Sequence, residues 1–165
     1  MDDMLIKFKE VIDEEIQAYE TLDELYSIKQ SILVQRKSDA LWDIDSQIVK
    51  EAEIIKEINK KRKNVAKYLG NEDITLAEVI EKAKQSNKDL ADKLSNQKER
   101  LNLLSNSLSH RENTNLHLIK HGLVMVQKTL DIIVDAIVPQ TKQYNKDGKN
   151  TEMDKSLISS IIEEA

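Results

Sequence analysis

The sequence predicts an all-α protein, an elongated antiparallel helical bundle or coiled coil with three long helices, one short helix and a flexible C-terminal tail. Charged residues make up 33% of the 165 residues and aromatic residues 4%, and there are only one proline and three glycines. This composition is typical of long solvent-exposed helices and has too few turn residues for a sheet protein. Apolar residues also recur at steps of three and four, as on one face of a helix. We expect a helical domain at residues 1–138 and a tail at residues 139–165, with a short amphipathic helix near its end.

The first long helix is expected from about residue 3 to residue 36, because its apolar side chains keep close to one face. Ser38 and Asp39 then offer side-chain acceptors for the start of a second helix, which we expect to end at Gly70. The short link between them favours an antiparallel hairpin. In such a hairpin the acidic start of the first helix would meet the basic run at residues 60–63. We expect Trp42 to pack at the hairpin end.

The second half of the chain predicts a short helix and a very long one. Thr75 and Glu78 have the spacing of a capping box, which opens a short helix to about Gln85. Ser86 and Asn87 form a soft break, although one continuous helix is the alternative. From Lys88 no strong helix breaker occurs before Pro139, so a last helix should fill this interval.

The last helix carries more apolar surface than one neighbour requires. At about 1.5 Å per residue the first two helices would be about 45 to 50 Å long and the last about 80 Å, so the hairpin cannot cover all of it. Its seam in the C-terminal half consists of Asn115, Leu116, Ile119, Leu123, Val126, Leu130, Ile133 and Ile137. A second apolar row consists of Leu118, Gly122, Met125, Ile132 and Ala136. This half is either a surface that binds a partner or the buried centre of a bundle.

Composition also limits the classes of function. A net charge of -5 gives no reason to expect nucleic-acid binding, and the lack of cysteine rules out a disulfide framework and a thiolate zinc site. The acidic N-terminus does not resemble a secretory signal, and charged residues interrupt the apolar stretch. We therefore expect a cytoplasmic protein.

The sequence contains no convincing set of catalytic residues. His117 and His121 would stack on one helical face and could bind a metal, but no Glu-x-x-His pair accompanies them, and exposed histidines on a polar face explain the spacing better. A glycine-rich phosphate loop is also missing. We expect no catalytic residue, metal site or cofactor.

Several motifs, taken in order, resemble the FlgN family of flagellar type III export chaperones. The early ones are the tyrosine-leucine repeat AYETLDELYSIKQSILV at residues 18–34, the Ser38-Asp39 turn, and the run from Ile54 to Arg62. The later ones are Asn115, Leu118, Ile119, Leu123 and Val126, followed by Tyr144 and Gly148 as a Tyr-x-x-x-Gly tail. The resemblance covers about residues 5 to 150. The isoleucine-rich extension after Asn150 is not expected from the family.

The resemblance implies a cytoplasmic chaperone without catalytic activity. It would bind the helical C-terminal segments of the hook-filament junction proteins, hook-associated proteins one and three, prevent their premature assembly and deliver them to the export gate at the membrane. The seam from Asn115 to Ile137 would be the partner-binding face, because an amphipathic helix needs an apolar groove. Tyr144 would contact the export gate, or else it packs back on the bundle. The alternative is a structural coiled-coil protein that forms a homodimer through its last helix.

Overall fold

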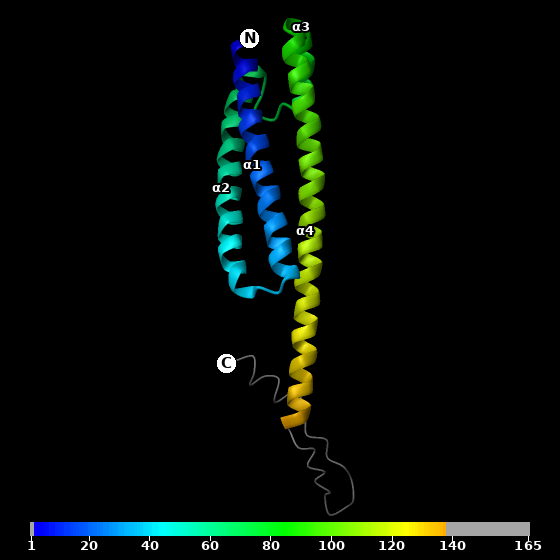
Figure 1. The fold of residues 1–165 in the computed structure, drawn as a ribbon. Coiled ribbons are helices and arrows are strands. Elements are labelled where there is room, and N and C mark those ends of the chain that lie inside the picture. The colour runs from blue at the N-terminus through cyan, green and yellow to red at the C-terminus, as the bar shows by residue number, and fades with distance from the viewer. Residues whose placement is uncertain (1, 138–165) are drawn as a thin grey trace, which may run out of the picture. The chain divides into compact units, whose positions relative to one another are not determined.

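The computed structural model describes residues 2–137, and nearly all of them lie in helices (Figure 1). In order, the elements are α1 (Asp2–Val34), the 3₁₀ helix η1 (Ser38–Ala40), α2 (Leu41–Leu69), α3 (Leu76–Ser86) and α4 (Lys88–Ile137). No strand occurs within residues 2–137, so the all-α prediction is confirmed. The expectations for Tyr144, for the tail from residue 139 and for its short helix lie outside the described residues.

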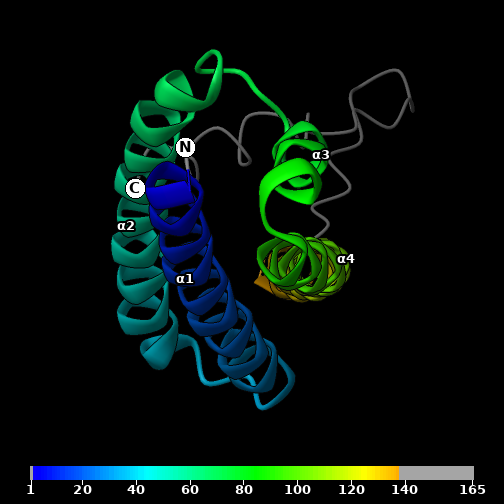
Figure 2. The same ribbon diagram turned by 90° about the horizontal axis from the view of Figure 1, so that it is seen from above.

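The chain divides into two compact units, Met1–Gly122 and a second that begins at Leu123. In the first unit α1 lies between α2 and α4, as Figures 1 and 2 both show. The α1–α2 pair is antiparallel, because Glu14 pairs with Lys61 (2.9 Å) near one end and Lys29 pairs with Asp45 (2.6 Å) near the other. The predicted hairpin is therefore confirmed.

Helix α4 packs along the other side of α1 and runs parallel to it. Near the start of α4 the Gln97 amide donates to the carbonyl of Lys9 (3.1 Å), and further along the Asn115 amide donates to the carbonyl of Tyr26 (3.0 Å). Both residue numbers rise together, which is the signature of a parallel pair. The antiparallel description thus applies to the hairpin, whereas α1 and α4 run in the same direction.

The main core of the first unit forms where all four helices meet. Its most deeply buried large side chains are Leu5, Phe8 and Ile12 of α1, Val79 of α3 and Leu94 of α4. A smaller buried cluster of Val11, Ala18, Ile55 and Ile58 continues between α1 and α2. Each fully buried side chain of the main core contributes about 1.5–3 kcal/mol to stability. The main core, in which Leu94 of α4 takes part, therefore anchors α4 to the hairpin.

The turn between α1 and α2 differs from the expected one. Helix α1 ends in a Schellman motif, in which Lys37 N donates to Ile32 O (3.1 Å) and Arg36 N donates to Leu33 O (3.2 Å). Arg36 takes the left-handed position with φ of 56°, where glycine is more usual. The predicted capping by Ser38 and Asp39 is wrong, because these residues form η1 and α2 begins after Ala40 without a side-chain cap.

The next three helix boundaries follow the expected chemistry. Helix α2 ends at Leu69, and Gly70 has φ of 154°, which few residues other than glycine adopt. Thr75 and Glu78 form the predicted capping box, with Thr75 N donating to Glu78 Oε2 at 2.7 Å. Asn87 separates α3 from α4 and accepts from Leu90 N at 3.1 Å through its side chain. One continuous helix through residue 87 is therefore excluded.

Trp42 does not pack at the hairpin end as expected. Its side chain is 80% exposed, and the first buried residue of α2 is Ile44. Because Trp42 and Ile44 are two residues apart, their side chains point to opposite sides of the helix. Ile44 lies on the side that faces the core, so Trp42 faces away from it.

One ion pair between α1 and α2 is buried on its acidic side. Glu15 is only 3% exposed, and its two carboxylate oxygens each accept from Arg62 Nη1 at 3.0 Å. Burial raises the pKa of the Glu15 carboxyl above its ordinary 4.5, while the charge of Arg62 and its hydrogen bond oppose the rise. Ionised Glu15 therefore depends on Arg62 in the folded chain.

We expect Arg62→Ala to lower the free energy of unfolding by about 1–3 kcal/mol near neutral pH, because it leaves a buried carboxylate unpaired. A raised folded pKa gives stability that is fully present below the ordinary pKa of 4.5 and is lost as pH rises through the folded value. Loss of Arg62 raises that pKa further, so the deficit should shrink on acidification. Urea unfolding at about pH 5 and about pH 7 measures this.

Lys60→Ala is the matched control for this experiment, because Lys60 pairs with Glu57 of its own helix on the surface. It should produce no comparable loss at either pH. A deficit for Arg62→Ala that grows on acidification would contradict the assignment.

Candidate functional site

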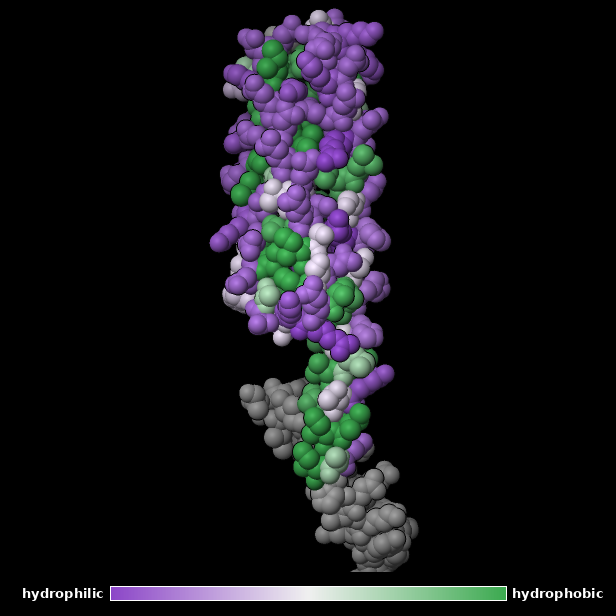
Figure 3. Space-filling model, viewed as in Figure 1, coloured by the Kyte–Doolittle hydropathy of each residue, from purple (hydrophilic) through white to green (hydrophobic). Residues whose placement is uncertain are grey.

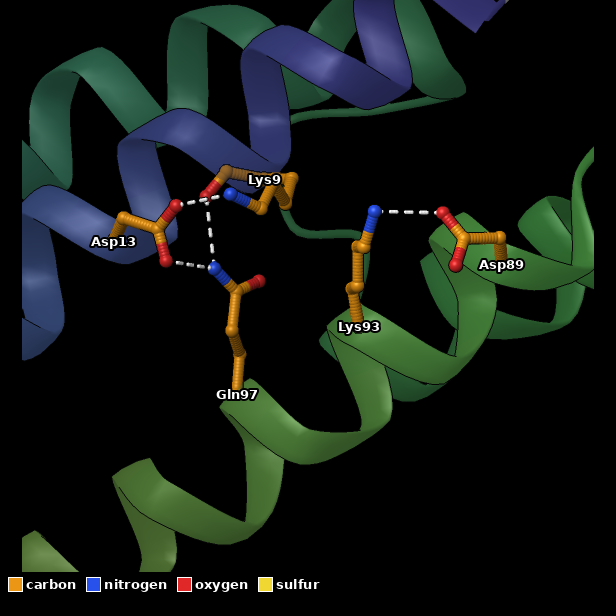
Figure 4. A network of polar contacts seen from close by, with 5 residues as sticks. All are labelled: Lys9, Asp13, Asp89, Lys93 and Gln97. Atoms are coloured by element: carbon orange, nitrogen blue, oxygen red, sulfur yellow. Dashed lines mark hydrogen bonds and ion pairs between the residues drawn. The ribbon is translucent and has the colours of Figure 1, made fainter.

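After Leu94, the last buried residue of α4 in the main core, polar side chains connect α4 to α1. Gln97 is buried, and its amide nitrogen donates to the Asp13 carboxylate as well as to the carbonyl of Lys9, while the Lys9 ammonium pairs with Asp13 (Figure 4). Lys93 and Asp89, also drawn in Figure 4, pair within α4. The Gln97 amide therefore fixes the alignment of α4 on α1 at this level.

Three further polar contacts continue this connection along α4. Arg100 binds Glu20 (2.6 Å), Arg111 binds Asp23 (2.9 Å), and the buried Asn115 binds the carbonyl of Tyr26. From one contact to the next, the residue on α4 and its partner on α1 both lie further along their helices. The two helices therefore keep one alignment over this length. Asn115 is the last buried residue of α4.

The apolar residues that follow Asn115 are less buried than Asn115 itself. Leu116 is 46% exposed, and Leu118 and Ile119 are half-buried. They belong to the first unit, which ends at Gly122.

In the second unit, α4 presents a series of exposed apolar side chains. The large ones are Leu123, Val124, Met125, Val126, Leu130, Ile132, Ile133 and Ile137, with exposed fractions between 36% and 72%. Figure 3 shows hydrophobic side chains gathered over this stretch. Of the two alternatives that the sequence left open, burial in the centre of a bundle does not hold for residues 123–137 within the single chain.

The exposed side chains define one apolar face, which we call the α4 face: Leu123, Val126, Leu130, Ile133 and Ile137. Successive steps of three and four place these five on one stripe that is about 21 Å long. Met125 and Ile132 widen the stripe on one side. The same geometry places Lys128, Asp131 and Asp135 on the opposite side of the helix.

The eight residues predicted as partner-binding thus fall into three groups. Asn115 is buried against α1, Leu116 and Ile119 lie on the first unit, and the other five form the α4 face. Val124 was in neither predicted row, yet it is 52% exposed. The only indication of this exposed position in the sequence is that Val124 is a branched apolar residue on the charged side of the helix.

Two further features of the described residues are the exposure of the two histidines and the lack of a metal-ligand cluster. His117 and His121 are exposed, and within residues 2–137 no group of three or more potential ligands is placed to hold a metal ion. No helix among these residues is long and apolar enough to cross a membrane.

An exposed apolar stripe at helical spacing is the kind of surface that binds amphipathic helices. The family model described as FlgN protein matches residues 1–152, and the chain belongs to the FlgN family. This is a family of flagellar export chaperones and not of enzymes. Searches of curated proteins and of solved structures found no match to the chain.

Two leucines of α4 test whether the α4 face is surface. Leu94 is fully buried, whereas Leu123 is 65% exposed. We expect Leu94→Ala to cost about 2–5 kcal/mol in the free energy of unfolding. Leu123→Ala should stay within about 0.5 kcal/mol of the unchanged protein. Denaturant unfolding followed by circular dichroism compares the two, and equal losses would show that Leu123 belongs to a core.

Proposed function

We propose that this protein is a cytoplasmic export chaperone whose α4 face binds the helical C-terminal segments of hook-associated proteins one and three. By covering these segments it prevents premature assembly, and it delivers the clients to the export gate at the membrane. The family supports the general role, and the exposure of the α4 face is the observation that carries the specific one.

The spacing of the α4 face suits a helical client. Five apolar side chains at steps of three and four offer about four turns of stripe, which matches the i, i+3, i+4 and i+7 anchors of an amphipathic helix. The charged residues of this stretch, Lys128, Asp131 and Asp135, lie on the opposite side of the helix, so they stay outside the proposed contact. Recognition of the client helix would then depend on the fit between apolar side chains.

The continuity of α4 prepares the face for binding. A segment as short as residues 123–137 would be a marginal helix by itself in water, because helix nucleation is costly. Here it extends a helix that begins at Lys88 and is anchored in the core through Leu94. The client therefore meets a stripe that is already formed, which reduces the entropy lost on binding.

Asn115 and Tyr144 have separate proposed roles. Asn115 was predicted as a partner-binding residue; because its amide donates to the carbonyl of Tyr26, we assign it the role of aligning α4 on α1 within the first unit. For Tyr144, which lies outside the described residues, we propose contact with the export gate.

Val126→Asp should weaken binding of a client C-terminal peptide by about tenfold to a hundredfold, because it buries a charge in an apolar contact. Val124→Asp is the matched control: the same substitution two residues away, about 200° around the helix. It should bind nearly as well as the unchanged protein. Isothermal titration with peptides of both hook-associated proteins measures the affinities, and circular dichroism verifies the helices.

Equal losses in the two variants, or no binding by the unchanged protein, would contradict the proposal. Analytical ultracentrifugation distinguishes the structural coiled-coil alternative. A tight dimer that Val126→Asp dissociates, together with no affinity for either client, would favour that alternative.

A further inference from the structure

The chain contains a segment of its own that matches the α4 face. Its apolar residues, Leu157, Ile158, Ile161 and Ile162, have the spacing of one face of a two-turn helix, and serines occupy the other positions between them. The family match ends at residue 152, so this segment lies beyond the part shared with the family. Glu163 and Glu164 follow the last apolar residue of the segment.

The length of the intervening chain allows the segment to reach the α4 face. Residues 138–156 connect the end of α4 to the segment, and a random coil of this length spans about 25 Å. From Ile137 back to Leu123 the helix measures about 21 Å. The segment can therefore lie on any part of the face without a stretched connection.

A tethered segment has an advantage over other occupants of the face. A connection of this length holds it at an effective concentration of about millimolar. A second copy of the chain at micromolar concentration would need about a thousandfold higher intrinsic affinity to compete. A two-turn helix is too short to be stable alone in water, so it would form as it docks and separate easily.

We propose that residues 156–164 dock as an amphipathic helix on the α4 face and that a client must displace them. The contact itself needs only this chain, and its regulatory effect rests on the proposed function. The segment covers about half of the stripe, so it shields apolar surface when no client is present. It lowers apparent client affinity by the fraction of chains in which the face is occupied.

The contact can be tested without any client. The chain has no cysteine, so Ser160→Cys gives a single site for a nitroxide spin label on the polar side of the segment. Backbone amide signals of residues 123–137 should lose most of their intensity in the labelled full chain. Adding Ile158→Asp and Ile161→Asp to the labelled chain should restore them.

Ser156→Asp with Ser159→Asp is the matched control, because it adds the same charge to the polar side and should leave the broadening unchanged. Broadening that Ile158→Asp and Ile161→Asp do not reduce would overturn the proposal. A mixture of isotope-labelled and spin-labelled chains identifies the other occupant: broadening that arises only between chains would show that a second copy covers the face.

The regulatory effect is tested by truncation after Glu152, which retains the family-matched region. The truncated chain should bind client peptide about threefold to tenfold more tightly, as expected if the segment occupies two-thirds to nine-tenths of the faces. Unchanged affinity would overturn the regulatory effect. If neither chain binds a client, the proposed function fails, and the spin-label experiment still decides the contact.

Discussion

The cluster in which all four helices meet is the interaction on which the rest of the first unit depends. Leu5 and Phe8 of α1 pack there with Val79 of α3 and Leu94 of α4, and these side chains are essentially without solvent contact. Further along, polar groups such as Gln97 and Arg111 also join α4 to α1, and such contacts contribute less stability than apolar burial. The cluster therefore anchors α4, and the polar contacts align it.

The difference between the apolar cluster and the polar contacts explains why the side chains of α4 differ along its length. Buried amides specify one register, because a shifted register would leave their polar atoms without partners. The amide nitrogens of Gln97 and Asn115 donate to the carbonyls of Lys9 and Tyr26, and a shifted register would break both contacts. After Asn115 the polar contacts give way to apolar side chains, and those from Leu123 onward are exposed. Asn115 is the last buried residue of α4 in the described part of the chain.

Much of the fold could be predicted from the sequence, because helix periodicity and the Thr75–Glu78 capping box are local signals. The turn after α1 was missed because arginine at position 36 takes a conformation usually associated with glycine. The wrong expectation for Trp42 arose because size and hydrophobicity do not reveal on which side of a helix the core lies. For the α4 face, the sequence predicted the stripe but left its burial open. That burial depends on which helices lie beside it, which is a tertiary property.

Hydrogen–deuterium exchange of the full chain would reveal whether a client helix covers the α4 face, as we propose. Amide exchange compared with and without a C-terminal peptide of a hook-associated protein reports where the protein is covered and stabilised. The account predicts slower exchange in residues 123–137 when the peptide is present, with little change in α2 (Leu41–Leu69). Slower exchange confined to the α1–α2 hairpin, with residues 123–137 unchanged, would contradict it.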